Sequence, residues 1–370
     1  SFPQAVRLLH QAGIYLRDRG LYEQAEPLLQ RSLEMSERAL GPEHPDTAQL
    51  LNDLGWLYYH QGKYDQAEAL YKRALIIREQ VFGTLHPDTA TTLNDLGLLY
   101  ENQGKYDQAE TLLQKALATR EEVWGYEHSD VGESLNNLAI FYYLQGKYDQ
   151  AELLMQQALT IREKVLGLDH PVVGESLNNL ASLYRNMGKY DQAEHLYLRS
   201  LRIREQALGA EHSLTALTLD NLGLLYQTQE KYREAEPLHQ RALIIFEKVL
   251  GTEHPDTAIA LYNLAKLFHV QRQYEHAQSL YLRSMAIFEQ VLGPVHFRVT
   301  ECLSSLAQLF NDRGEHEQAE LLFQYVSKIR EQTSDAEHPD LLKVREDYDK
   351  MFHTLQQNPR STRQLGNVIG

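Results

Sequence analysis

The sequence predicts an all-α solenoid of about eight helix pairs. A period of forty-two residues runs through the chain, each copy carries two helical patterns, and small residues recur at fixed places in every copy. A constant period of this length is typical of repeats that stack only on their neighbours. We expect one solenoid over residues 1–357 and a flexible tail at 358–370. The repeats lie near 5–41, 45–83, 87–125, 129–167, 171–209, 213–251, 255–293 and 297–335, followed by a closing helix at 338–357.

The first helix of a repeat is best defined at about Pro45 to Gln61. Pro45 suits the first helical position, and Asp46 lies in the first turn, where the helix dipole favours a negative charge. Leucines recur there at three- and four-residue spacing and make one apolar stripe. Gly62 is expected to end this helix in the left-handed conformation.

The second helix is expected to open at Asp65. An aspartate followed three residues later by Glu68 has the pattern of a capping box, and Gly83 terminates the helix. Because the link between the two helices is short, they must be antiparallel neighbours.

Small residues mark where the two helices cross. A larger side chain at such a crossing would force the helices apart, at a cost of about 1–3 kcal/mol. One position is alanine in every repeat: Ala25, Ala67, Ala109, Ala151, Ala193, Ala235, Ala277 and Ala319. The other is always glycine or alanine: Gly13, Gly55, Gly97, Ala139, Ala181, Gly223, Ala265 and Ala307.

Composition and charge exclude several classes of partner. The net charge of −15 argues against nucleic acid and against anionic lipid, because both need a basic footprint. No apolar run is long enough to span a bilayer, and no signal peptide precedes the repeats. The single cysteine, Cys302, fits a reducing compartment, so we expect a cytoplasmic protein. The chain starts without methionine, and we expect it to be a fragment of a longer protein.

A histidine recurs at the joint between repeats, in phrases such as GPEHPDTA. Packed helices lie about 8–10 Å apart, so equivalent histidines of successive repeats are too far apart to share one metal ion. We therefore expect each histidine to cap the following helix or to pack between repeats. The eight are His44, His86, His128, His170, His212, His254, His296 and His338.

No arrangement of residues indicates catalysis. GKY at 62–64 is not a phosphate-binding loop, because no Ser or Thr follows the lysine and no strand precedes it. No Ser-His-Asp set or carboxylate pair stands out. We expect no enzyme, no cofactor and no metal in these residues, although a catalytic domain could lie outside them.

The repeat resembles a known family. A small residue at Gly55, together with Tyr58, Ala67, Tyr71 and Ala74, matches the signature of the tetratricopeptide (TPR) repeat. The longer phrase around HPDTA, LNNLA, QGKYDQAE and IRE looks like the forty-two-residue repeats of kinesin light chains and of arrays in bacterial STAND (NB-ARC-type) signalling ATPases. The resemblance implies a right-handed superhelix whose first helices line a concave groove that binds proteins or peptides.

Two adjacent columns of asparagine lie on the first helices, where the resemblance places the groove. An amide has donors and an acceptor, so it can pair with the backbone of an extended peptide. The alternative is that one asparagine of each pair bridges neighbouring helices. For the first column the sequence does not distinguish the two roles, and for the second it favours the groove. The first column is Asn52, Asn94, Asn136 and Asn178, and the second is Asn137, Asn179, Asn221 and Asn263.

Residues that do not repeat are expected to give the groove its specificity. Aromatic and arginine side chains are frequent anchors in interfaces. The groove would be acidic with aromatic islands, and its partner a segment with basic and apolar residues; a solvated acidic face is the alternative. The residues concerned are Glu133, Glu175, Trp56, Tyr59, Tyr143, Arg185 and Tyr262.

Two cationic columns are expected to have no part in binding. The lysines at positions 63, 105, 147, 189 and 231 should form a solvated rim. The arginines at positions 78, 120, 162 and 204 lie in the last turns of second helices, where the helix dipole favours a positive charge, and we expect a structural role.

Three functions are consistent with these features. The leading one is a recognition module for a protein or peptide, acting as the sensor part of a larger bacterial signalling ATPase. The second is a cargo or peptide adapter similar to kinesin light chains. The third is a structural scaffold that associates through its end repeats.

Overall fold

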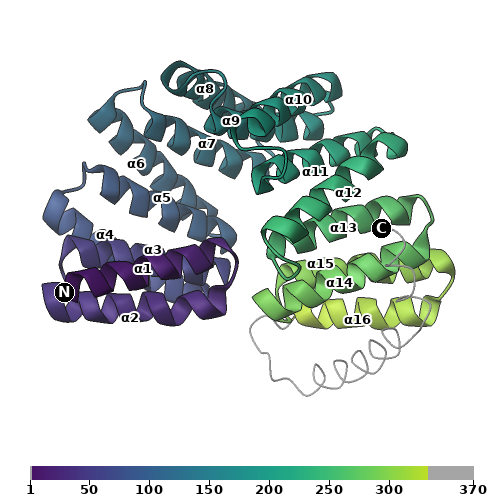
Figure 1. Ribbon diagram of the computed structural model, residues 1–370, viewed down its shortest axis with the longest axis horizontal. Coiled ribbons are helices and arrows are strands. Elements are labelled where there is room, and N and C mark those ends of the chain that lie inside the picture. Colours follow the sequence, from purple (N-terminus) through teal and green to yellow (C-terminus); the bar gives the residue numbers. More distant parts are fainter. Residues whose placement is uncertain (1, 332–370) are drawn as a thin grey trace. The chain divides into compact units, whose positions relative to one another are not determined.

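A computed structural model of the chain describes residues 2–331, and within that range sixteen helices and no strand are present (Figure 1). The predicted all-α architecture of paired helices is confirmed. The closing helix and tail expected after residue 337, and His338, lie outside the described residues. The helices are α1 (Phe2–Asp18), α2 (Tyr22–Leu40), α3 (Pro45–His60), α4 (Tyr64–Phe82), α5 (Pro87–Asn102), α6 (Tyr106–Trp124), α7 (Ser129–Leu144), α8 (Tyr148–Leu166), α9 (Pro171–Asn186), α10 (Tyr190–Ala207), α11 (Ser213–Thr228), α12 (Tyr232–Val249), α13 (Pro255–Val270), α14 (Tyr274–Leu292), α15 (Phe297–Arg313) and α16 (His316–Glu331).

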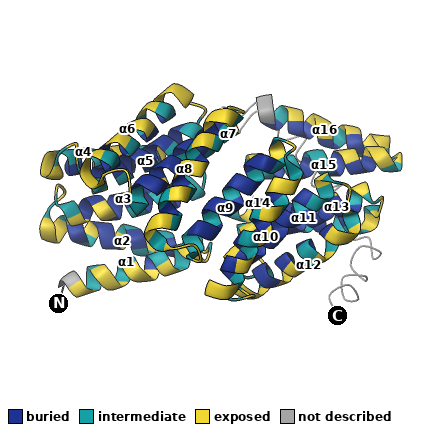
Figure 2. Cartoon of the chain, turned by 90° about the horizontal axis from the view of Figure 1, so that it is seen from above, coloured by how far each residue is buried: buried dark blue, intermediate teal, exposed yellow. Residues whose placement is uncertain are grey.

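The chain divides into two compact units, residues 1–225 and 226–370. In each unit the first helix of a repeat packs on its own second helix, and that second helix packs on the next first helix. Buried residues lie mainly on the helix sides that face a neighbour in the same unit (Figure 2). In unit 1, successive first helices also touch one another: α1 with α3, α3 with α5, α5 with α7 and α7 with α9. We call the surface of α1, α3, α5, α7 and α9, together with the part of α11 that belongs to unit 1, the first-helix face of unit 1.

Each described joint histidine caps the helix that follows it. The ring Nδ1 accepts a hydrogen bond from the backbone N–H two residues on, over 3.0–3.3 Å. This satisfies one of the free N–H groups at a helix start. The prediction of a capping role is confirmed for all seven histidines from His44 to His296.

The cap at His296 should make stability depend on pH. Burial, and to a smaller extent the nearby Arg298 charge, lower the pKa of His296 to about 4. Because an unfolded histidine titrates near 6.5, the unfolded state binds more protons between pH 6.5 and 4, so stability falls as pH falls through that window. His296→Asn keeps a capping oxygen without this titration. Thermal unfolding should show that the melting temperature of the natural chain falls more between pH 8 and pH 4.5 than that of the variant. An equal fall in both proteins would contradict this expectation.

The second helix begins earlier than predicted, and the capping-box interpretation is wrong. In α4 the N-cap residue is Lys63, whose side chain makes no capping bond, and Asp65 lies inside the first turn. Instead of capping, the Glu68 carboxylate accepts hydrogen bonds from Lys72 Nζ of its own helix at 2.6 Å and, in the next repeat, from Lys105 Nζ and Tyr100 Oη at 3.1 Å each. The capping-box pattern therefore did not reveal the partners of Glu68 in the next repeat.

The lysines at 63, 105, 147 and 231 are exposed, as expected of a solvated rim, but the column also makes contacts that were not predicted, as the example of Lys189 shows. Lys189 Nζ lies 2.8 Å from Glu152 of the preceding repeat and 5.0 Å from the centre of the Tyr184 ring. The same arrangement joins Lys63 to Glu26 at 2.8 Å. These ion pairs connect the turn of one repeat to the second helix of the repeat before it.

The small residues lie at the predicted helix crossings. The eight recurring alanines are at most 3% exposed. A Cβ atom added at Gly97 would lie 2.9 Å from Leu113 Cγ, and one added at Gly55 would lie 2.9 Å from Tyr71 Cε1. Such distances are too short for normal packing, so the glycines let the two helices approach closely.

Buried arginines join successive repeats in unit 1. Arg204 of α10 is 1% exposed, and its Nη1 donates to Thr218 Oγ1 at 2.7 Å and to the Leu214 carbonyl at 2.8 Å, both on α11. Equivalent bonds link arginine to a hydroxyl at three earlier joints, over 2.6–3.0 Å. The predicted structural role is confirmed, but the predicted position in the last turn of the helix is right for Arg204 and wrong for the other three. The other arginine–hydroxyl pairs are Arg78 with Thr92, Arg120 with Ser134, and Arg162 with Ser176.

In unit 2 the same joint is apolar. Phe246 and Phe288 occupy the arginine position, and Ala260 and Cys302 occupy the hydroxyl position. All four are buried. Where the arginine is lost, the hydroxyl is lost with it, as expected because a buried hydroxyl without a partner is costly.

Candidate binding face

A ladder of polar side chains connects the first helices across the first-helix face. Each rung joins a residue to one forty-three positions later, on the next first helix. Asn137 Nδ2 donates to Asn94 Oδ1 at 3.0 Å, and Asn179 Nδ2 donates to Asn136 Oδ1 at 3.1 Å. The remaining rungs of this asparagine ladder in unit 1 are His10 with Asp53, Asn52 with Asp95, and Asn221 with Asn178.

The two asparagine columns therefore have different environments. The first column, Asn52, Asn94, Asn136 and Asn178, is 3–5% exposed and bridges neighbouring helices, which is the alternative considered for it. The second-column residues Asn137, Asn179 and Asn221 are only half-buried. Each uses one N–H in its rung, and an amide has a second N–H and an oxygen besides. The second column can therefore bridge the helices and still contact a ligand.

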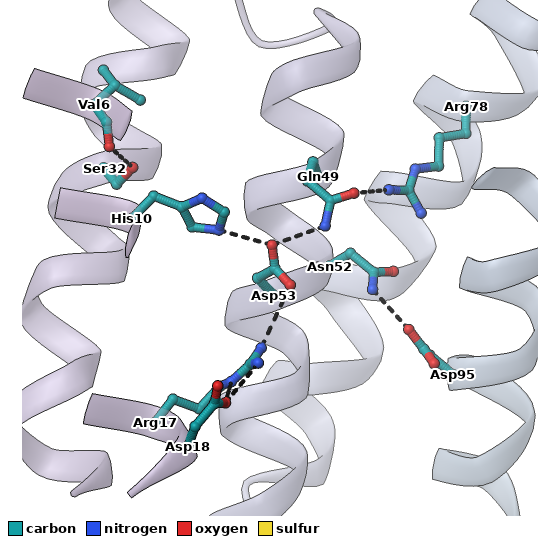
Figure 3. A network of polar contacts seen from close by, with 10 residues as sticks. All are labelled: Val6, His10, Arg17, Asp18, Ser32, Gln49, Asn52, Asp53, Arg78 and Asp95. Carbon is teal, nitrogen blue, oxygen red and sulfur yellow. Dashed lines mark hydrogen bonds and ion pairs between the residues drawn. The ribbon is translucent and has the colours of Figure 1, made fainter. Parts of the chain in front are cut away.

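The ladder is charged at its N-terminal end (Figure 3). Asp53 accepts hydrogen bonds from His10 Nε2 at 2.9 Å and from Gln49 Nε2 at 2.9 Å, and Arg17 Nη1 lies 3.6 Å from it. On the next helix Asp95 accepts from Asn52 Nδ2 at 2.7 Å, and burial raises the pKa of Asp95 to about 6. This end of the face is an internally paired network.

A second ladder lies about two helical turns further along the first helices. Asn102 Nδ2 donates to Tyr59 Oη at 2.6 Å, and Asn186 Nδ2 donates to Tyr143 Oη at 2.6 Å. We call this the tyrosine ladder. It holds the predicted residues Tyr59 and Tyr143 in fixed positions at the edge of the face.

An apolar row runs between the two ladders. Trp56, Leu98 and Ile140 occupy the same position in successive repeats, and all three are half-buried. Trp56 is already in contact with the protein: the His60 ring centre lies 3.6 Å from the Trp56 ring centre, and the Arg17 guanidinium lies 4.4 Å from it. Leu98 and Ile140 form an apolar surface between the two ladders.

Two predicted acidic residues have partners within the chain. Glu133 lies 3.6 Å from Arg120 Nη1, and Glu175 lies 3.7 Å from Arg162 Nη1. Both carboxylates remain nearly half exposed. Replacement of either glutamate by lysine would repel the neighbouring buried arginine as well as a basic ligand. The part of Glu133 and Glu175 in binding stays a prediction. Arg185, also predicted, has a buried Nη1 that makes no hydrogen bond.

Tyr262 and Asn263, the last of the predicted residues, belong to unit 2. Both are buried, with 8% exposure each. Tyr262 Oη lies 2.9 Å from Ser305 Oγ on α15, in the register of the asparagine ladder. Tyr262 takes the register of the first column, whereas Asn263 belongs to the second column and is buried, unlike Asn137, Asn179 and Asn221.

Several residues of the face were not predicted from the sequence: Leu98, Glu101, Asn102, Ile140, Leu144 and Asn186. The sequence signal that could have revealed them is that complementary side chains recur forty-three residues apart, one more than the repeat period.

Between residues 2 and 331 no three His, Cys, Asp or Glu side chains gather closely enough to hold a metal ion. Over the same range, no helix combines the length and apolarity needed to cross a membrane.

Comparison with known families agrees with the repeat architecture. A profile described as tetratricopeptide repeat matches residues 4–75, 57–122, 130–206, 174–247, 214–290 and 268–332. A second tetratricopeptide-repeat profile matches residues 94–164. The chain is a tetratricopeptide-repeat protein. No curated protein matches its sequence significantly.

Solved structures similar to this TPR protein include kinesin-light-chain-like repeats. The nearly identical TPR-like repeats of a protein described as a Podosopora anserina kinesin light chain are 25% identical, over 55% of this chain and 97% of that one, with a TM-score of 0.47. BtubC (BKLC) from P. vanneervenii is 25% identical, over 62% and 92%, with a TM-score of 0.52. The Rap conjugation regulator of plasmid pLS20, solved with the Phr* peptide, is 17% identical, over 80% and 76%, with a TM-score of 0.60.

Proposed function

We propose that the first-helix face of unit 1 binds an extended segment of a protein or peptide, chiefly through the backbone of that segment. The observation that carries this proposal is the second asparagine column, whose amides are half-buried and use a single N–H in their rungs. Backbone N–H and C=O groups are complementary to such amides. The TPR fold, and a structural neighbour solved with a peptide, support the same class of function.

The spacing of the asparagines suits an extended chain. Successive first helices touch, and packed helices lie about 8–10 Å apart. An extended peptide advances about 3.3 Å per residue. Asn137, Asn179 and Asn221 would therefore meet the backbone at roughly every third residue, while Leu98 and Ile140 contact the side chains between them.

Selection from a random dodecapeptide phage library tests this proposal. We expect the natural protein to enrich peptides whose affinity falls at least tenfold on the double variant Asn137→Ala/Asn179→Ala. The matched control is Thr111→Ala/Gln157→Ala, which alters two exposed polar residues on second helices. Circular dichroism checks that both variants keep their helix content. Equal loss in both variants, or no enrichment with the natural protein, would contradict the proposal.

The wider role follows from the repeat type. The resemblance to STAND arrays favours the sensor part of a larger bacterial signalling ATPase, and the kinesin-light-chain-like neighbours favour an adapter as the second candidate. The full-length gene distinguishes the two, because a nucleotide-binding core belongs to the sensor and a heptad coiled coil to the adapter. Either role uses the same peptide-binding face.

A further inference from the structure

Between the two rungs of the tyrosine ladder, an open rung lies at Glu101 on α5. Its rungs pair a residue with an asparagine forty-three positions later, as in Tyr59 with Asn102. At the corresponding position after Glu101 stands Leu144, which has no donor to offer. Glu101 Oε2 is buried and accepts no hydrogen bond, while the Leu144 side chain is 62% exposed. By the register of the ladder, an unsatisfied carboxylate oxygen and an exposed aliphatic side chain therefore occupy the two ends of this rung.

The surroundings of Glu101 suit a cation. Burial raises the pKa of Glu101 to about 7, and no positive group among residues 2–331 offsets that effect. A buried carboxylate is normally paired, so the missing partner is a positively charged donor. The tyrosine ring of Tyr59 on α3 is close enough for the Glu101 charge to raise the pKa of its phenol further, after burial itself. Aromatic faces next to a carboxylate favour ammonium and guanidinium groups.

Resting on the peptide-binding function proposed above, we propose that Glu101 and Leu144 form a subsite for a lysine or arginine side chain of the bound segment. The cationic group takes the place of the asparagine that closes the neighbouring rungs. The methylene groups of the same side chain cover Leu144, because long cationic side chains bury their stems on apolar surface. The subsite lies at the edge of the face, one helical turn from Ile140 and about two turns from Asn137 of the second asparagine column.

Glu101 differs in its environment from the two acidic residues that the sequence predicts in the groove. Glu133 and Glu175 lie beside buried arginines of the chain itself, at 3.6 and 3.7 Å. In the part of the chain that the structure describes, Glu101 has no arginine partner, and its Oε2 is buried without a hydrogen bond. A cationic ligand should therefore stabilise the Glu101 carboxylate more than that of Glu133 or Glu175.

Phage selection at pH 8, where Glu101 is mostly ionised, tests the subsite with three proteins. The natural protein should enrich dodecapeptides with lysine or arginine at one fixed position. Glu101→Gln removes the charge, and Leu144→Asn supplies the missing rung from within the chain. Both should abolish the positional preference and weaken a natural-protein-selected peptide at least tenfold. Asp107→Asn, which removes an exposed carboxylate on a second helix, should do neither.

A synthetic analogue completes the test. Replacement of the selected lysine or arginine by glutamine should weaken binding to the natural protein but not to Glu101→Gln. Enriched peptides that depend on Asn137 and Asn179 but show no basic preference would overturn the subsite and leave the peptide-binding function standing. A basic preference retained in Glu101→Gln and Leu144→Asn would also overturn it. No enrichment at all would overturn both proposals.

Discussion

Arg204→Phe should destabilise the protein by about 2–4 kcal/mol, and adding Thr218→Ala should restore most of that loss. The single substitution removes the donor to Thr218 and to the Leu214 carbonyl inside a buried joint. Thr218→Ala alone leaves the buried guanidinium with fewer acceptors and should cost about 1–3 kcal/mol. The double variant reproduces the pair that the chain already uses at Phe246 and Ala260. A buried polar pair can often be exchanged for a well-packed apolar one at little net cost.

Urea unfolding of the four proteins gives the coupling between the two positions. We expect a coupling free energy of about 1–3 kcal/mol, with the double variant within about 1 kcal/mol of the natural chain. Arg199→Ala is the matched control: its half-exposed ion pair with Glu163, at 2.7 Å, should contribute no more than about 1 kcal/mol. If the two single losses simply add in the double variant, the account of the joint is wrong.

Asp95→Asn should stabilise the protein by about 1–3 kcal/mol at pH 8. Burial raises the pKa of Asp95 to about 6, so its ionised form is unfavourable in the folded state above that pH. Asparagine occupies the same position in the following repeats, and its oxygen can still accept from Asn52. The folded natural chain binds more protons than the unfolded chain between pH 6 and about 4, so the advantage of asparagine should shrink across that window.

Urea unfolding at pH 8, 6 and 4.5 measures this effect. Asp53→Asn is the matched control. Asp53 pairs with His10 and Arg17, so removal of its charge should lower the stability of the protein. An advantage of Asp95→Asn that stays constant from pH 8 to 4.5 would show that burial of the Asp95 charge is not its cause.

The features predicted from the sequence are those determined within one repeat. The histidine caps follow from the position of His44 just before Pro45, and the helix crossings follow from residues such as Gly97 and Ala109 that recur in register. These depend on local geometry and on the bulk of single side chains. They can therefore be derived from one copy of the repeat and checked against the others.

The features that were missed depend on contacts between repeats. Glu68 fits a capping box in its own repeat, but its carboxylate pairs with Lys72 of its own helix and also with Lys105 of the next repeat, and the second contact could not be predicted from one repeat. Rungs such as Asn136 with Asn179 join positions forty-three residues apart because adjacent first helices pack with a one-residue offset. That offset arises from packing and cannot be read from the period. The open rung at Glu101 becomes visible only once the pairs on either side are known.

Photo-crosslinking tests the central claim most directly: that unit 1 binds its partner on the first-helix face. A photoreactive benzoylphenylalanine would be placed at Leu98, in the apolar row of that face, or at Leu153, an exposed residue on the second helix α8. With a phage-selected peptide bound, the account predicts strong crosslinking from position 98 and little from position 153. Crosslinking from position 153 but not from position 98 would contradict it.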